Sequence, residues 1–319
     1  MARPTPDKVR RVACVGTGLM GGGWAAHFLA KGFDVSVQDP DPKAEAKLHR
    51  LLDQAWPFLE ELGLAPGASR SRLKFSTSLG DIVKDADFIQ ESAPEKLEIK
   101  VKLLPQIEEA APKDIVISSS TSGFIMSDIQ KESIHPERTV IGHPFNPPHI
   151  IPLVEVCGGR KTSEWAVDWA CDFYNRNGHY AIKMIKEAPG HIANRLQQAM
   201  WHEALHMVQD GIATPEQINA AIRQGPGLRW AMMGSFVHMH MAGGEGGMRH
   251  FFEHFDMENA SVWSKLASPK LTPEMKTKVI EACERMAEGK SYTELSRARD
   301  KNLVAIIKAL RANKDWVKG

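Results

Sequence analysis

The sequence predicts an α/β domain with a doubly wound, mostly parallel sheet at residues 1–188 and an all-α domain at residues 189–319. In the first part, short apolar runs alternate with longer helix-like stretches, which is the pattern of parallel strands joined by crossover helices. After residue 192 almost every segment has helical periodicity. Pro189-Gly190 lies between the two parts, and we interpret this turn signal as the domain hinge.

Apolar runs bounded by turn residues locate the individual elements. Strands are expected at Arg11–Val15, Val35–Gln38, Leu73–Phe75, Phe88–Gln90, Ile115–Ser118, Val140–Gly142 and Leu153–Cys157. Helices are expected between most of these strands, at Leu19–Lys31, Pro42–Leu62, Leu97–Ala111 and Ser163–Asn177. The clearest helices of the second domain are Met200–Gln209, Pro215–Gln224, Pro273–Glu288 and Leu303–Asn313. The alternation in the first domain implies crossover units and a parallel sheet.

Composition and charge exclude several classes of protein. The 319 residues are 43% apolar and 25% charged, an ordinary globular mix, and the formal net charge is +1. Bulk charge therefore attracts neither nucleic acid nor an anionic membrane. No apolar run approaches the ~18 residues of a membrane helix, and Met1–Arg11 has no apolar signal core. The four cysteines form no C-x-x-C pair, so we expect a reduced, cytoplasmic protein without bound metal.

A glycine-rich motif, Gly16-Thr17-Gly18-Leu19-Met20-Gly21, follows the first expected strand and opens a helix. This is the context that the dinucleotide-binding motif of a Rossmann domain requires. Gly16 permits the tight turn, Gly18 lets a pyrophosphate approach the backbone, and Gly21 lets helix and strand pack closely. The phosphates would lie on free N–H groups at the start of the helix. The expected cofactor-binding residues are Gly16, Gly18, Leu19, Met20 and Gly21; a purely structural glycine turn is the alternative.

Asp39 ends the second expected strand. An acidic residue at this place accepts hydrogen bonds from a ribose 2′-hydroxyl and repels a 2′-phosphate. Asp39 therefore favours NAD over NADP as the cofactor. The alternative is a solvated loop carboxylate before Pro40.

A candidate acid–base pair consists of His143 and Glu155. His143 lies in the stiff run Gly142-His143-Pro144-Phe145-Asn146-Pro147, which we interpret as a loop after a strand. Histidine is the natural general base near neutral pH. Glu155 is a single charge in the apolar strand Leu153–Cys157, and a buried carboxylate is costly unless it is paired. Pairing with His143 would satisfy it, whereas the alternative is a loop histidine and a surface glutamate.

Together these residues resemble the 3-hydroxyacyl-CoA dehydrogenase superfamily. The resemblance rests on Gly16–Gly21, Asp39, Glu91–Glu95, Ser119–Ser122, His143–Pro147, Leu153–Val156 and Pro189–Arg195, which occur in the family's order over essentially the whole chain. It implies a Rossmann domain that binds NAD, a helical C-terminal domain and a dimer built through the helices. A helical domain rich in Met, Trp and Phe also has more apolar faces than its own packing consumes, which favours the same homodimer.

The resemblance also implies roles for single residues. His143 would take the proton from the 3-hydroxyl of a small substrate while hydride goes to the nicotinamide, and Glu155 would orient His143 and stabilise its charge. Ser122 and Asn194 would hydrogen-bond the reacting oxygen or the imidazole. Without the resemblance, Ser122 is an ordinary polar loop residue and Asn194 a helix-capping residue. Glu95 and Lys100 would lie near the nicotinamide ribose.

The sequence departs from the acyl-CoA members at Ser120, where they commonly carry Asn, and in Asp41–Leu73, where basic and acidic residues balance instead of forming a phosphate patch. Ile89–Glu95, Ser119–Gly123 and Gly227–Trp230 instead resemble the L-carnitine dehydrogenase branch, with the lambda-crystallin/L-gulonate 3-dehydrogenase branch next. The expected substrate is therefore L-carnitine, oxidised to 3-dehydrocarnitine. A 3-hydroxyacyl-CoA such as 3-hydroxybutyryl-CoA and L-gulonate are the competitors.

Recognition of L-carnitine makes two chemical demands. Its trimethylammonium group has no N–H and needs aromatic faces, for which Trp230 and Phe236 are candidates. Its carboxylate needs a cation such as Arg229, through a bidentate contact. The alternative is that the two aromatic residues pack the helical core.

A different class of function follows from His202-Glu203-Ala204-Leu205-His206, which matches H-E-x-x-H. On a helix this spacing puts two imidazoles on one face beside a carboxylate, as in zinc hydrolases. The motif is short, and no third ligand follows at the expected spacing, so a structural interpretation of His202, Glu203 and His206 is preferred.

Overall fold

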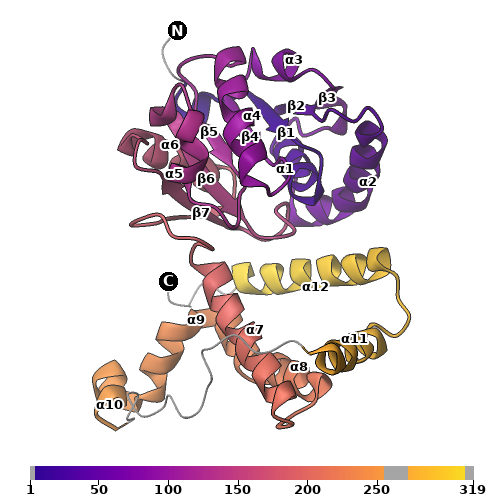
Figure 1. Cartoon of the computed structure of the whole chain (residues 1–319), viewed down its shortest axis with the longest axis vertical. Helices are drawn as coiled ribbons and strands as arrows, with labels where there is room; N and C mark the ends of the chain where they lie inside the picture. Colours follow the sequence, from indigo (N-terminus) through magenta and orange to yellow (C-terminus); the bar gives the residue numbers. More distant parts are fainter. Residues whose placement is uncertain (1–3, 255–271, 313–319) are drawn as a thin grey trace. The chain divides into compact units, whose positions relative to one another are not determined.

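The protein divides into two compact units in a computed structural model, which describes residues 4–254 and 272–312. The first unit comprises Met1–Asn194 with Asp300–Val304, and the second comprises Arg195–Arg299 with Ala305–Gly319. Figure 1 shows the strands in the first unit and a set of helices in the second.

The first unit is built on one eight-stranded sheet with the order β3-β2-β1-β4-β5-β6-β7-β8. The strands are β1 Arg11–Val15, β2 Asp34–Gln38, β3 Leu73–Ser76, β4 Phe88–Glu91, β5 Ile117–Ser119, β6 Thr139–Pro144, β7 Leu153–Gly158 and β8 Tyr180–Lys183. Every neighbouring pair is parallel except β6 and β7. The predicted doubly wound, mostly parallel sheet is thus confirmed. The strand order reverses between β1 and β4, and ligands of such sheets bind at the carboxyl ends beside this reversal.

Helices cover the sheet of the first unit (Figure 1). They are α1 Leu19–Ala30, α2 Ala44–Leu62, α3 Leu79–Val83, α4 Leu97–Ala110, α5 Met126–Ile129 and α6 Glu164–Arg176. Helix α6 shows why such segments are helical. Its buried residues include Ala166, Ala170, Phe173 and Tyr174, whose spacing places them on one face.

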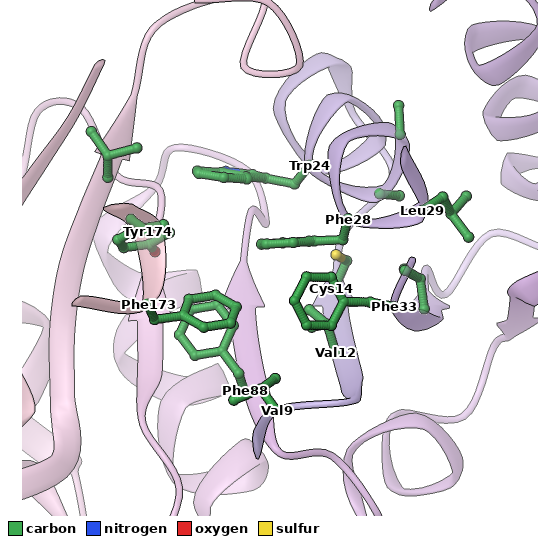
Figure 2. Close-up of a cluster of buried hydrophobic side chains, with 14 of the residues drawn as sticks. Val9, Val12, Cys14, Trp24, Phe28, Leu29, Phe33, Phe88, Phe173 and Tyr174 are labelled. Atoms are coloured by element: carbon green, nitrogen blue, oxygen red, sulfur yellow. The ribbon is translucent and has the colours of Figure 1, made fainter. Parts of the chain in front are cut away.

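The buried apolar side chains that pack on the sheet form two clusters among the described residues, because successive strand residues point to opposite faces of the sheet. In β1, Cys14 belongs to one cluster and Val15 to the other. Aromatic side chains dominate the first cluster (Figure 2). The ring centroids of Phe88 and Phe173 lie 4.4 Å apart. This packing fixes α1 and α6 against the strands whose ends carry the candidate site.

The described part of the second unit is all-helical, as the predicted fold class requires. Its helices are α7 Ala193–Gln209, α8 Pro215–Gln224, α9 Pro226–Ala242, α10 Gly247–His254, α11 Pro273–Ala287 and α12 Tyr292–Ala312. The first two residues of α7 and Asp300–Val304 of α12 belong to the first unit. Helix α8 begins with a capping box, in which Thr214 and Gln217 each bind the other's backbone N–H. The expected last helix begins earlier than predicted, at Tyr292, and its expected end, Asn313, lies outside the described residues. Among the described residues, no helix is long and apolar enough to cross a membrane.

Candidate active site

The glycine-rich turn joins β1 to α1, and its three glycines differ in how closely other atoms approach them. Gly16 has a φ of 99°, and a Cβ there would lie 2.5 Å from the carbonyl oxygen of Ser92. A Cβ at Gly21 would lie 2.0 Å from the carbonyl oxygen of Gly16. At Gly18 the added carbon meets nothing within 4 Å. The turn therefore needs glycine at its two tight positions and leaves the backbone at Gly18 open to approach.

The start of α1 offers hydrogen-bond donors beside this opening. The first N–H groups of a helix have no acceptor within it, and the capping residue Gly18 has no side chain to supply one. Leu19 is 55% exposed and Met20 is half-buried, so the first turn of α1 is accessible. Exposed N–H groups at the positive end of a helix are suited to bind phosphate oxygens.

Asp39 lies just beyond β2 and is tied to the glycine-rich turn. One of its oxygens, Oδ2, accepts hydrogen bonds from the Thr17 hydroxyl at 2.6 Å and the Thr17 N–H at 3.2 Å. Its Oδ1 accepts from the N–H of Asp41 at 3.1 Å. Thr17 therefore orients the carboxylate, a role that the sequence did not suggest because position 17 is variable in the motif.

Glu95 organises the loop that follows β5. Its Oε1 accepts hydrogen bonds from the Thr121 hydroxyl at 2.7 Å and from the N–H groups of Ser122 at 2.9 Å and Gly123 at 2.8 Å. Burial alone would raise the pKa of Glu95, but these hydrogen bonds and the charge of Lys100 outweigh it, so the pKa lies below its usual value. The ionised Glu95 thus holds Ser122 in place at the carboxyl edge of the sheet.

Lys100 is buried between two carboxylates. The residue is 2% exposed, and its Nζ lies 2.8 Å from Glu91 and 3.5 Å from Glu95. A buried ammonium is stable only when paired, and both carboxylates serve that need. Lys100 therefore binds Glu95, the other residue predicted to lie near the nicotinamide ribose.

The central contact of the site joins His143 and Glu155. The two residues are directly opposed in the antiparallel register of β6 and β7. The Nδ1 atom of His143 lies 2.8 Å from Oε2 of Glu155, whose exposed fraction is 0%. His143 lies within β6 and not in a loop after it, because β7 returns beside β6 and extends the strand to Pro144. The expectation of a loop histidine was therefore wrong, while the expected partner is the observed one.

The second oxygen of Glu155 binds the start of α7. Its Oε1 accepts hydrogen bonds from the N–H groups of Ile192 at 2.8 Å and Ala193 at 3.0 Å. Burial would raise the pKa of Glu155, but the hydrogen bonds from His143, Ala193 and Ile192 lower it further than burial raises it. Glu155 is therefore ionised at neutral pH. The half-buried Asn194 follows directly in the chain.

A type II-like turn at the expected hinge delivers these N–H groups. The N–H of His191 binds the carbonyl of Ala188 at 3.0 Å, and Gly190 has a φ of 74°. His191 itself is buried, with its ring centroid 4.8 Å from that of His143. The sequence gives no signal that His191 belongs to the site, because only the fold brings it close to His143.

Comparisons with known proteins agree with this geometry. The family model of the NAD-binding domain of 3-hydroxyacyl-CoA dehydrogenase matches residues 11–188, and the model of the C-terminal domain matches residues 190–279. The chain belongs to the 3-hydroxyacyl-CoA dehydrogenase family. It is an NAD-dependent oxidoreductase of the 3-hydroxy acid dehydrogenase type, and the predicted cofactor is confirmed.

Its relatives within the family include curated enzymes of similar length. The chain is 51% identical to L-carnitine dehydrogenase of Nocardiopsis dassonvillei over 309 residues, which cover 97% of this chain and 94% of the relative. It is 53% identical to L-carnitine dehydrogenase of Streptomyces griseus over 304 residues, 95% of this chain and 91% of the relative.

Solved structures show the same architecture. A 5-formyl-3-hydroxy-2-methylpyridine 4-carboxylic acid 5-dehydrogenase, described as an NAD⁺-dependent dismutase, aligns with a TM-score of 0.82 at 29% identity, over 96% of this chain and 100% of that one. The 3-hydroxybutyryl-CoA dehydrogenase of Escherichia coli aligns with a TM-score of 0.64 at 25% identity, over 86% of this chain and 57% of that one.

Ser120, which departs from the common pattern of the acyl-CoA members, has a structural role in this chain. Its hydroxyl oxygen lies 2.8 Å from Gln90 Nε2, 2.8 Å from the Ser92 hydroxyl and 3.2 Å from Trp24 Nε1. A small hydroxyl group thus links the ends of β4 and β5 to α1. Ser122, two residues further on, is half-buried. It directly follows Thr121, whose carbonyl oxygen lies 3.0 Å from Nε2 of His191.

The remaining candidates lie in the second unit. Arg229, Trp230 and Phe236 are exposed on α9, and a non-helical residue, Gly234 with a φ of 64°, separates Phe236 from the other two. The H-E-x-x-H motif lies on α7, where Nε2 of His202 lies 2.6 Å from the amide of Gln198. No group of three metal-ligating side chains that could hold a metal ion occurs among residues 4–254 and 272–312. The family assignment replaces the zinc hydrolase alternative.

Proposed function

We propose that this enzyme oxidises the 3-hydroxyl of L-carnitine to give 3-dehydrocarnitine and NADH, with His143 as the general base. The buried hydrogen bond between His143 and Glu155, at the carboxyl edge of a Rossmann sheet, carries the proposal for the reaction. The relatives named L-carnitine dehydrogenase support the choice of substrate.

The dyad geometry defines what His143 does. An ionised carboxylate only accepts hydrogen bonds, so Nδ1 of His143 carries the proton shared with Glu155. The other ring nitrogen, Nε2, then has a lone pair that takes the hydroxyl proton. NAD, when bound, would accept the hydride from the carbon that carries this hydroxyl group. The charge of Glu155 stabilises the resulting imidazolium.

The other predicted site residues assist this step. We place Ser122 and Asn194 at the reacting oxygen or at His143. Glu95 lies at the nicotinamide ribose and positions the Ser122 loop, and Lys100 keeps Glu95 ionised and oriented. The pyrophosphate is bound by the five predicted residues of the glycine-rich turn, which are Gly16, Gly18, Leu19, Met20 and Gly21.

The choice of carnitine also follows from the balance of charges in Asp41–Leu73, which offers no basic patch for CoA phosphates. We propose that Trp230 and Phe236 contact the trimethylammonium group, each aromatic face contributing ~0.5–2 kcal/mol, and that Arg229 binds the carboxylate. Residues 189–319 would then form the substrate and dimerisation domain.

The substrate proposal is tested with L-carnitine, L-gulonate, 3-hydroxybutyrate and 3-hydroxybutyryl-CoA, each followed by NADH absorbance. We expect kcat/KM for L-carnitine to exceed that for every other compound by at least about 100-fold. L-Gulonate and 3-hydroxybutyrate lack the quaternary ammonium group, and 3-hydroxybutyryl-CoA lacks both this group and the free carboxylate, so each leaves part of the site unfilled. A far higher kcat/KM for 3-hydroxybutyryl-CoA than for L-carnitine would show that the substrate is an acyl-CoA, as in other members of the family.

The cofactor preference depends on Asp39. We expect Asp39→Ser to narrow the preference for NAD over NADP by about 10-fold or more, because a carboxylate beside a 2′-phosphate is repelled. The measurement is kcat/KM for both cofactors with L-carnitine at saturation. Asp53→Ser, which changes an exposed carboxylate paired with Arg70, is the control. An unchanged ratio in Asp39→Ser would show that Asp39 does not lie at the ribose.

We further propose a homodimer formed through the helical unit. Helix α9 is rich in apolar residues, yet none of its described residues is buried. Leu228 is 61% exposed and Phe236 is 82% exposed. An apolar cavity of about 560 Å³ lies among α7, α8 and α11, lined by side chains such as Met207 and Ile222. Exposed apolar side chains on α9, such as Leu228 and Phe236, fit an interface with a second copy of the chain. Sedimentation at micromolar concentration should give a dimer, and a monomer would contradict the proposal.

A further inference from the structure

His191 is a buried histidine that the proposed reaction does not use. Its exposed fraction is 1%, and its φ of 52° lies in the left-handed region. Residues with a Cβ rarely adopt this region, so contacts around His191 must hold it there.

The contacts of His191 link three parts of the candidate site. Its Nε2 lies 3.0 Å from the carbonyl oxygen of Thr121, at the head of the loop that carries Ser122. Its ring packs beside that of His143. The two residues that follow it donate their N–H groups to Glu155. One residue therefore connects the β5 loop, the β6 histidine and the β7 glutamate.

The protonation of His191 follows from these contacts. A carbonyl oxygen only accepts, so Nε2 carries the proton and Nδ1 has a lone pair. This Nδ1 has no hydrogen-bond partner among the described residues. Nε2–H is thus the one ring donor of the neutral His191, and Thr121 accepts it.

Burial keeps His191 neutral, since its pKa is lowered from the ordinary value. Burial lowers its pKa most, and the neighbouring His143 lowers it too, although the hydrogen bond to Thr121 and the carboxylates of Glu155 and Glu95 oppose them. Nε2–H is a donor in this neutral tautomer and also in the protonated ring, so the hydrogen bond to Thr121 does not depend on the charge of His191.

We propose that His191 is a positioning residue that sets the distance between the Ser122 loop and the His143–Glu155 pair. Glu95 accepts three hydrogen bonds from the Thr121–Gly123 loop. His191 donates to the carbonyl oxygen of Thr121 in the same loop. This inference rests on the proposed role of His143 and Glu155. It adds that productive alignment of Ser122 needs a donor at position 191.

Two substitutions of His191 test the proposal, and both must adopt the same left-handed backbone conformation. His191→Phe keeps a ring beside His143 and removes the donor, whereas the terminal amide of His191→Gln can replace Nε2–H. Both introduce a side chain with a Cβ at the same left-handed position, so backbone strain is matched. We expect His191→Phe to lower kcat by about 10–100-fold, because small misplacements of reacting groups have effects of this size. The KM for NAD should change less than about threefold, and His191→Gln should keep kcat within about fivefold of wild type.

His143→Asn is measured in parallel to separate the two ideas. If His191→Phe keeps kcat within twofold, or if His191→Gln loses as much as His191→Phe, His191 has no positioning role. If these results occur while His143→Asn is inactive, only the inference about His191 fails. If His143→Asn keeps its turnover, the proposed reaction itself is wrong. Thermal unfolding of each variant verifies that the compared proteins are folded.

Discussion

His143→Asn is expected to lower kcat for NADH formation from L-carnitine by about 10²–10⁴-fold, the usual contribution of a positioned general base. Asparagine retains a buried polar group opposite Glu155 but cannot take up a proton near neutral pH. The affinity for NAD should stay within about threefold, because the glycine-rich turn and Asp39 are unchanged. Initial rates give the first quantity, and quenching of tryptophan fluorescence by the cofactor gives the second.

The chain offers a matched control for this substitution. His135 lies 3.5 Å from Glu137 on the surface, with a side chain that is 38% exposed. His135→Asn breaks a histidine–glutamate contact of the same kind outside the site, and it should leave kcat unchanged within about twofold, because exposed pairs contribute little. If both variants had near-normal turnover, His143 would not be the base.

Glu155→Gln is expected to lower kcat by about 10²–10⁴-fold through the wrong tautomer of His143. Three donors converge on the carboxylate: Nδ1–H of His143 and the N–H groups of Ile192 and Ala193. An amide has one acceptor oxygen, so it cannot serve both sides. If the oxygen faces α7, the amide N–H donates to Nδ1 and the proton of His143 moves to Nε2, which can no longer act as a base.

The same substitution has a consequence for stability that depends on pH. A hydrogen bond to a charged group stabilises the folded protein by ~1.5–3 kcal/mol, more than one to a neutral amide, so Glu155→Gln lowers the free energy of unfolding. The pKa of Glu155 is lowered from 4.5 in the folded protein, so its contribution is present above the unfolded value and is lost as pH falls through the folded value. Denaturant unfolding should therefore show a constant deficit of Glu155→Gln above about pH 5 and a shrinking deficit below it. A deficit that does not depend on pH would contradict the ionised state of Glu155.

The fold was predictable because its signals are local. Alternating apolar strands and helices, the glycine-rich turn and Pro189-Gly190 each act within a few residues. Strand β8 was missed because it is short and only half-buried, so its four residues carry little apolar signal. The antiparallel direction of β7 was missed because a strand's composition does not fix its direction.

The candidate site was predictable only where burial conflicts with charge. Glu155 in an apolar run required a partner, and the structure gives it His143. The burial of Lys100 between Glu91 and Glu95 could not be predicted, because it depends on how α4 packs on the sheet. His191 depends on a left-handed backbone that the sequence would assign to glycine. Residues that act through tertiary contacts therefore need the structure.

The most direct test of the central claim uses L-carnitine carrying deuterium in place of hydrogen at C3. Oxidation at the 3-hydroxyl moves that atom to the cofactor with its electron pair, while the hydroxyl proton goes to His143 and then to solvent. Mass spectrometry of the reduced cofactor should find one deuterium per NADH in the wild-type enzyme, and almost no reduced cofactor with His143→Asn. Reduced cofactor without deuterium, or no reduction by L-carnitine under conditions in which another 3-hydroxy compound is oxidised, would contradict the account.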